Sequence, residues 1–191
     1  MAKQGKATVL NEEQNREFLS FLGSKRHPER NICIYLLGTK AGLRIGEIAK
    51  LKLTDILTEG GELKEVITLR SEVTKGKKIR TAFINNPELQ SALVKYLSVR
   101  PKYKVDTLFC SQQMKAFSAN SLSKIMLKLF KSAGFDSSSS HQGRRMFCSN
   151  LVKSGLDIVS VSKCMGHSSI QTTMGYVETD QNTLLSAIGN I

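Results

Sequence analysis

Several features that mark membrane, secreted or repeat proteins are missing from this sequence of 191 residues. No apolar run approaches the length of about 20 residues that crosses a bilayer. The N-terminal stretch MAKQGKATVLNEEQ carries charge with no apolar segment behind it, so we expect no signal peptide. Internal repeats and low-complexity segments are also missing. We therefore expect a globular domain that works in the cytoplasm and does not bind a membrane.

Cysteine and histidine are scarce and scattered. None of the four cysteines forms a CxxC pair, and we predict reduced thiols, and neither disulfides nor zinc ligands. The cysteines are Cys33, Cys110, Cys148 and Cys164. The three histidines have no cysteine or aspartate partner nearby, so a structural metal is not expected.

Acidic residues are few relative to basic ones. The chain has 16 Asp and Glu against 28 Lys and Arg, which gives a formal net charge of +12. Such an excess suits a polyanionic partner such as nucleic acid. A basic protein with a solvated cationic surface explains the charge equally well, so the motifs must decide. The length suits one domain with a hydrophobic core.

The hydrophobic pattern predicts mainly helices with a small antiparallel β-sheet, an α+β fold. Expected helices cover residues 11–23, 29–41, 87–100, 121–134, 141–155, 158–166, 170–176 and 181–191. Val, Ile and Thr are frequent in residues 64–70 and 78–84, which predicts a hairpin, and residues 107–110 are a further extended stretch. The predicted N-caps are Asn11, Asn120, Asp157 and one of Ser168 and Ser169.

Residues 141–176 carry an unusual set of chemical groups. His141 and Arg144 are three positions apart and share one face of a helix. His167 follows a glycine between two helical patterns, and Tyr176 lies nine residues further on. A guanidinium matches the non-bridging oxygens of a phosphodiester, and an imidazole relays a proton near neutral pH. A phenol becomes a nucleophile where cations favour the phenolate. The pattern indicates a tyrosine that attacks a phosphate.

This stretch resembles the catalytic motif of the tyrosine recombinases, the phage integrase family. The family carries HxxR, then a Gly-His dipeptide and then a tyrosine, matched here by residues 141–144, residues 166–167 and Tyr176. The resemblance implies the fold of the recombinase catalytic domain over residues 11–191, including a C-terminal tail helix. Residues 1–10 would be a flexible basic lead-in.

Two further motifs of the family are present. Its first catalytic arginine lies in a pattern AGLRxxExxxLxxxDI, which places the arginine at Arg44. Considered alone, Arg44 would be a surface residue paired with Glu47, three positions away. The family also carries a lysine on a β-hairpin in a pattern like KGxKxR, matched by residues 75–80 with Lys75 in the catalytic place. Lys77 stays an alternative because hairpin registers shift easily.

The resemblance implies a site-specific DNA recombinase that cleaves and rejoins strands through a 3′-phosphotyrosine, with no cofactor. Its implied catalytic residues are Arg44, Lys75, His141, Arg144, His167 and Tyr176. The implied partners are double-stranded DNA, further copies of the chain in a tetramer joined through the tail, and an accessory DNA-bending protein. A type IB topoisomerase, a non-catalytic DNA-binding regulator and a plain basic nucleic-acid-binding module are the competing hypotheses.

Some positions depart from the family pattern. Most members carry a helical domain before the catalytic one, and here the catalytic domain's own first helices occupy most of the residues before Arg44. We expect no separate N-terminal core-binding domain. Such a one-domain layout resembles that of the short invertases of the fimbrial switch. The alternative is that the chain is a fragment of a longer protein. Gly143 replaces the usual Leu within HxxR, and Arg145 stands where His is common. Gly143 weakens helix formation there.

Overall fold

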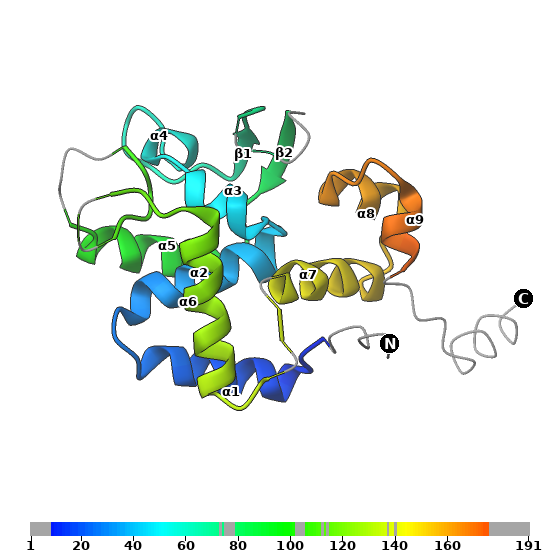
Figure 1. The fold of residues 1–191 in the computed structure, drawn as a ribbon. Helices are drawn as coiled ribbons and strands as arrows, with labels where there is room; N and C mark the ends of the chain where they lie inside the picture. The colour runs from blue at the N-terminus through cyan, green and yellow to red at the C-terminus, as the bar shows by residue number, and fades with distance from the viewer. Residues whose placement is uncertain are drawn as a thin grey trace, which may run out of the picture. The chain divides into compact units, whose positions relative to one another are not determined.

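The computed structural model describes most of the chain, namely residues 9–72, 74, 79–101, 106–111, 113, 115–136, 138–139 and 141–175. These residues form nine helices and two strands, so the predicted mainly helical α+β class is confirmed (Figure 1). The chain divides into two compact units, Met1–Phe147 and Cys148–Ile191. Lys75, Lys77, Tyr176 and the predicted tail helix lie outside the described residues.

Helix α2 (Pro28–Ala41) is the centre of the first unit and is buried along most of its length. It packs against α1 (Glu12–Gly23) and α5 (Pro87–Val99), as Figure 1 shows. Pro28 lies in its first turn, and Gly42 ends it in the left-handed conformation with φ 63°. The α2 helix and its terminal glycine agree with the sequence pattern, as does Asn11, whose side chain accepts from the N–H of Gln14 at the start of α1.

Two short helices, α3 (Ile45–Lys50) and α4 (Leu53–Ile56), follow α2 and begin in the same way. The carboxylate of Glu47 accepts a hydrogen bond from the backbone N–H of Arg44 at 2.8 Å. Asp55 does the same for the backbone N–H of Lys52, also at 2.8 Å. In each case a carboxylate in the first turn binds an N–H that the helix itself leaves unpaired.

The predicted hairpin is present as two antiparallel strands, β1 (Val66–Leu69) and β2 (Arg80–Phe83). The register pairs Val66 with Phe83 and Leu69 with Arg80. Ile67, Leu69 and Ala82 are buried, whereas their strand neighbours are more exposed. This alternation gives the sheet one face toward the core. Residues 107–110, expected as an extended stretch, make only isolated bridges, Lys52 with Thr107 and Cys110 with Ala116.

Helix α6 (Ala119–Ser132) packs against α3. Its cap is Ser118, whose side chain accepts from the N–H of Ser121, and the prediction of Asn120 was wrong. Asn120 lies within the first turn of the helix, so its side chain is not in the N-cap position. Phe130 stacks on Phe18 with ring centroids 4.2 Å apart, which joins α6 to α1 in the core.

The second unit holds the end of α7 (Gln142–Lys153), α8 (Ile158–Met165) and α9 (Ile170–Met174). Asp157 caps α8 as predicted, and its carboxylate accepts from the N–H groups of Val159 and Ser160. Ser169 occupies the N-cap position of α9 but makes no capping hydrogen bond through its side chain. The four cysteines are free thiols. Among the described residues, no helix has the length and apolar character needed to span a bilayer.

Candidate active site

Arg44 occupies the N-cap position of α3 and is held by Glu47. Its Nη1 donates to Oε1 of Glu47 at 2.8 Å, and its backbone N–H donates to Oε2 at 2.8 Å. The ion pair expected from their spacing is therefore present, but it is not a surface pair. The side chain of Glu47 is 1% exposed, against 21% for Arg44. One buried carboxylate thus caps the helix and fixes the guanidinium.

A second arginine, Arg80 on β2, binds the same carboxylate. Its Nη2 donates to Oε2 of Glu47 at 2.5 Å, and its Nε donates to Oε1 at 3.2 Å. Burial by itself raises the pKa of the Glu47 carboxyl, but the hydrogen bonds and charges of Arg80 and Arg44 outweigh it. The net result is a pKa below the ordinary value of 4.5. Glu47 is therefore an ionised carboxylate shared by two guanidinium groups.

Arg144 lies in the first turn of α7 and is 6% exposed. Its Nη1 donates to the backbone carbonyl of Gly42, the residue that ends α2. The same carbonyl receives a longer contact of 3.4 Å from Nη2 of Arg80. Arg80 thereby links Arg44, through Glu47, to Arg144, through the carbonyl of Gly42. We call this set the arginine network; its members are Arg44, Glu47, Arg80, Gly42 and Arg144.

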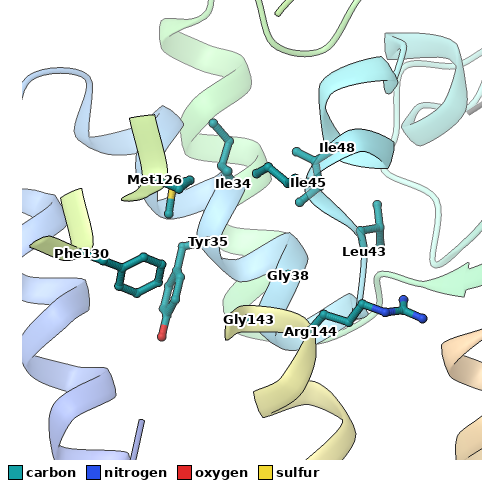
Figure 2. A pocket seen from close by; sticks show the side chains of 10 residues that line it. All are labelled: Ile34, Tyr35, Gly38, Leu43, Ile45, Ile48, Met126, Phe130, Gly143 and Arg144. Atoms are coloured by element: carbon teal, nitrogen blue, oxygen red, sulfur yellow. The ribbon is translucent and has the colours of Figure 1, made fainter. Parts of the chain in front are cut away.

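Two glycines let α7 approach α2 closely enough for Arg144 to reach Gly42. A Cβ atom on Gly143 would lie 3.1 Å from the carbonyl carbon of Gly38 and 3.2 Å from its Cα. The structure thus explains why a small residue stands where the family usually has leucine. Figure 2 shows Gly38 beside Gly143. Both glycines line a small apolar cavity of 20 Å³, and the guanidinium of Arg144 points away from the aromatic rings that line it.

His141 lies one position before α7, on the same turn as Arg144. It is exposed, and its backbone N–H donates to the hydroxyl of Ser139 at 3.3 Å. Its carbonyl accepts from the N–H of Arg145 at 3.0 Å. The predicted placement of His141 and Arg144 together at the start of a helix agrees with the structure.

His167 belongs to the second unit and directly follows the end of α8. Gly166 adopts the left-handed conformation with φ 58°, and the N–H of His167 donates to the carbonyl of Ser162 at 3.1 Å. The Nδ1 atom of the imidazole lies 2.7 Å from the hydroxyl of Thr173, a fully buried residue of α9. The Gly-His dipeptide therefore sets the backbone, and Thr173 sets the orientation of the ring.

The described tyrosines, Tyr35 and Tyr96, are poor nucleophiles. Burial raises the pKa of both phenols. The hydroxyl of Tyr35 donates to Asn15 at 2.7 Å, and that of Tyr96 donates to the carbonyl of Leu108 at 3.1 Å. Tyr103, like Tyr176, lies outside the described residues.

Sequence reasoning missed three members of this site. Arg80 matches the hairpin motif but was given no role, the carbonyl of Gly42 carries no sequence signal, and Thr173 was not singled out. A signal for the capping role of Glu47 was present, because a carboxylate three residues after an N-cap is typical of a helix start. The partner of Nδ1 of His167 could not be read from chain order, because it depends on how α9 folds back.

Comparisons with known proteins identify the family of the chain. Residues 8–183 match the model of the phage integrase family. Tyrosine recombinase XerD of Rickettsia bellii is 32% identical over 193 residues, covering 94% of this chain and 62% of that protein. Tyrosine recombinase XerA of Pyrococcus furiosus is 30% identical over 182 residues, covering 94% of this chain and 60% of that protein.

Solved structures give the same result. The crystal structure of XerA recombinase has a TM-score of 0.77 and 26% identity, covering 96% of this chain and 64% of that chain. The XerH site-specific recombinase, bound to difH substrate in a pre-cleavage complex, has a TM-score of 0.74 and 25% identity, covering 98% and 55%. The chain thus spans about 60% of the length of the curated relatives that it matches. By sequence and by fold, it belongs to the phage integrase family.

Proposed function

We propose that the chain is a site-specific DNA recombinase that cleaves and rejoins strands through a bond between Tyr176 and a DNA 3′-phosphate. The observation that carries this proposal is the arginine network, which fixes Arg44 and Arg144 through shared hydrogen-bond partners. Membership in the phage integrase family supports it. So does the XerH site-specific recombinase, which was solved bound to difH substrate in a pre-cleavage complex.

The two guanidinium groups would bind the non-bridging oxygens of the phosphodiester that is cut. In-line attack spreads negative charge over these oxygens, and pre-positioned cations stabilise that charge. Arg44 and Arg144 are suited to this because each is fixed before substrate arrives. The network contains three arginines and one glutamate, and cationic groups of this kind suit an anionic substrate.

Protons move on both sides of the phosphorus in this proposal. The hydroxyl of Tyr176 attacks while its proton passes to His141, and the 5′-oxygen leaves with a proton from Lys75 or, failing that, Lys77. His167, oriented by Thr173, binds the phosphate. The phosphotyrosine keeps the energy of the broken bond, so a 5′-hydroxyl can reverse the reaction on another strand without a cofactor.

Double-stranded DNA is the proposed partner. The net charge of +12 favours it, and the exposed lysines of α6, Lys124, Lys128 and Lys131, could follow a phosphate backbone. We further propose a tetramer on DNA that is joined through the C-terminal tail, and an accessory DNA-bending protein. The reaction would take place in the cytoplasm.

A covalent trapping assay tests the proposal. The chain is mixed with nicked duplexes that tile the DNA flanking its gene, denatured, and analysed for a protein–DNA adduct. We expect an adduct that is lost in Tyr176→Phe. Tyr103→Phe is the matched control, because Tyr103 is a tyrosine outside the family motif, and its adduct should persist.

Other outcomes would contradict the proposal. Specific binding to one duplex with no adduct would favour the DNA-binding regulator. Relaxation of supercoiled plasmid without sequence preference would favour a topoisomerase. An adduct that survives Tyr176→Phe would assign the nucleophile to another residue.

A further inference from the structure

We propose that Arg80 is a positioning residue for strand cleavage, holding Arg44 through Glu47 and Arg144 through the carbonyl of Gly42. This inference rests on the function proposed above for Arg44 and Arg144. In it, Arg80 does not contact the phosphate and acts only through the residues that it binds.

The contact between Arg80 and Glu47 has the geometry needed for positioning. Nε and Nη2 of Arg80 bind different oxygens of the carboxylate, at 3.2 Å and 2.5 Å. A two-point contact of this kind fixes the plane of the carboxylate as well as its position. Arg44 then donates its Nη1 to an acceptor that is already oriented. The Arg80 side chain is 8% exposed, so water competes little for these bonds.

Charge balance argues against a purely structural ion pair. One arginine is enough to neutralise a buried carboxylate, and Arg44 already does so at 2.8 Å. A second guanidinium on the same carboxylate adds repulsion between cations, which folding alone does not require. A bound phosphodiester would relieve that repulsion. Two guanidinium groups on one carboxylate therefore suit a site that binds an anion.

Arg80 also connects the hairpin to Glu47, because it lies at the start of β2. It is the first residue of β2 and pairs with Leu69 of β1. In the sequence it closely follows residues 75–78, which include both candidate lysines. The contact with Glu47 thus ties the start of β2 to the same carboxylate that holds Arg44.

Arg70 supplies a matched control. It directly follows β1, and its Nη2 lies 3.3 Å from Oδ2 of Asp55, the capping carboxylate of α4. Both arginines therefore adjoin the same sheet and bind a carboxylate that caps a helix. Arg70, however, binds Asp55, which lies outside the arginine network. Replacing it removes a more exposed ion pair beside the same sheet without touching Arg44 or Arg144.

The experiment compares Arg80→Met, Arg80→Lys and Arg70→Met. The rate of adduct formation is measured in single turnover at saturating protein, on the nicked duplex that traps the wild type, and the Kd for that duplex is measured separately. We expect Arg80→Met to slow the adduct by about tenfold to a hundredfold, as residues that orient metal ligands do, with Kd nearly unchanged. Arg80→Lys should recover only part of the rate, because an ammonium cannot make the two-point contact. Arg70→Met should match the wild type.

A readout independent of activity is the NMR signal of the Arg44 guanidinium, assigned by its loss in Arg44→Lys. We expect it to shift or broaden in Arg80→Met and to stay unchanged in Arg70→Met. A lower Tm in Arg80→Met, with an unchanged signal and an unchanged rate for folded protein, would overturn the inference. Full rescue by Arg80→Lys would also overturn it. If the wild type gave no adduct, the proposed function would fail, while the NMR signal would still decide whether Arg80 positions Arg44.

Discussion

The arginine network of the first unit and His167 of the second unit, called below the arginine side and the histidine side, are held by different contacts. In the first unit, two guanidinium groups share the buried carboxylate of Glu47, and two share the carbonyl of Gly42. In the second unit, Nδ1 of the His167 ring lies 2.7 Å from the hydroxyl of Thr173. Buried charge networks act as a unit, whereas one hydrogen bond between side chains contributes about 1 kcal/mol.

This difference predicts that substitutions on the two sides affect stability and catalysis differently. On the arginine side, the groups that would bind phosphate are also part of the core, so a change there should affect folding and chemistry together. On the histidine side, the ring can lose its orientation while the fold stays intact. The following substitutions test that contrast, beginning with the largest expected effect.

Replacing Glu47 by Gln should have the largest effect on stability. The amide leaves Arg80 and Arg44 without their shared anion, and removing one partner of a buried ion pair costs about 3–5 kcal/mol. Asp55→Asn is the control, because Asp55 also caps a helix but pairs with the half-exposed Arg70, so about 0–1 kcal/mol is expected. Urea unfolding measures both, and equal losses would contradict the contrast.

The lowered pKa of Glu47 also predicts how the stability difference between the wild type and Glu47→Gln depends on pH. A carboxyl whose pKa is lower in the folded state stabilises the fold above its ordinary value of 4.5. That contribution is lost as the pH falls through the folded value. The gap in unfolding free energy between wild type and Glu47→Gln should therefore narrow below about pH 4.5. A constant gap down to pH 2 would show that the charge of Glu47 is not what stabilises the network.

Replacing Gly42 by Ala should come next. A Cβ at this position would lie 2.3 Å from Cδ1 of Phe147, and φ is 63°. The left-handed conformation costs about 1–2 kcal/mol, and overpacking adds about 1–3 kcal/mol. Gly61→Ala separates the two causes, because Gly61 has φ 83° and a methyl group added there would meet nothing within 4 Å. A Gly61→Ala loss as large as that of Gly42→Ala would rule out the contact with Phe147 as a cause.

Replacing the two glycines where α2 meets α7 by alanine should change the free energy of unfolding by different amounts, and by less than Gly42→Ala does. A Cβ on Gly143 would crowd the backbone of Gly38 at 3.1 Å, whereas a Cβ on Gly38 meets Gly143 at an ordinary 3.5 Å. Alanine favours a helix by about 1 kcal/mol over glycine. We expect Gly38→Ala to be neutral or stabilising, and Gly143→Ala to lose about 1–2 kcal/mol because overpacking outweighs propensity. Gly143→Ala should also slow adduct formation, since Arg144 is the next residue.

These glycines show which features of the fold can be predicted from the sequence and which cannot. Helix-ending glycines at positions 42 and 166, the cap at Asp157 and the hairpin were all predicted, because each depends on a few adjacent residues. Gly143 was noted only as a departure that weakens a helix. Its reason lies in Gly38, more than a hundred positions away, and no local pattern reveals such a contact.

The site follows the same division. Motif order singled out Arg44, His141 and Arg144, and the pattern placed His141 and Arg144 at the start of a helix, as α7 has them. The position of Arg44 at the start of α3 was not predicted. The sequence suggested a surface pair for Glu47, because spacing along a helix carries no information about burial. Burial and the second guanidinium come from β2, which reaches Glu47 only in the folded chain. The catalytic roles assigned to Arg44, His141 and Arg144, and to Lys75, His167 and Tyr176, stay predictions.

Replacing Thr173 by Val should have a small effect on stability and a separate effect on catalysis. Valine keeps the shape of the buried side chain but removes the hydroxyl that lies 2.7 Å from Nδ1 of His167. We expect a loss of about 1 kcal/mol in unfolding free energy and a slower adduct by about tenfold, because the ring is no longer oriented toward the phosphate. Thr172→Val, an exposed neighbour on α9, should change neither quantity. If Thr173→Val instead lost several kcal/mol with an unchanged rate, the histidine side would be held by packing, and the contrast between the two sides would disappear.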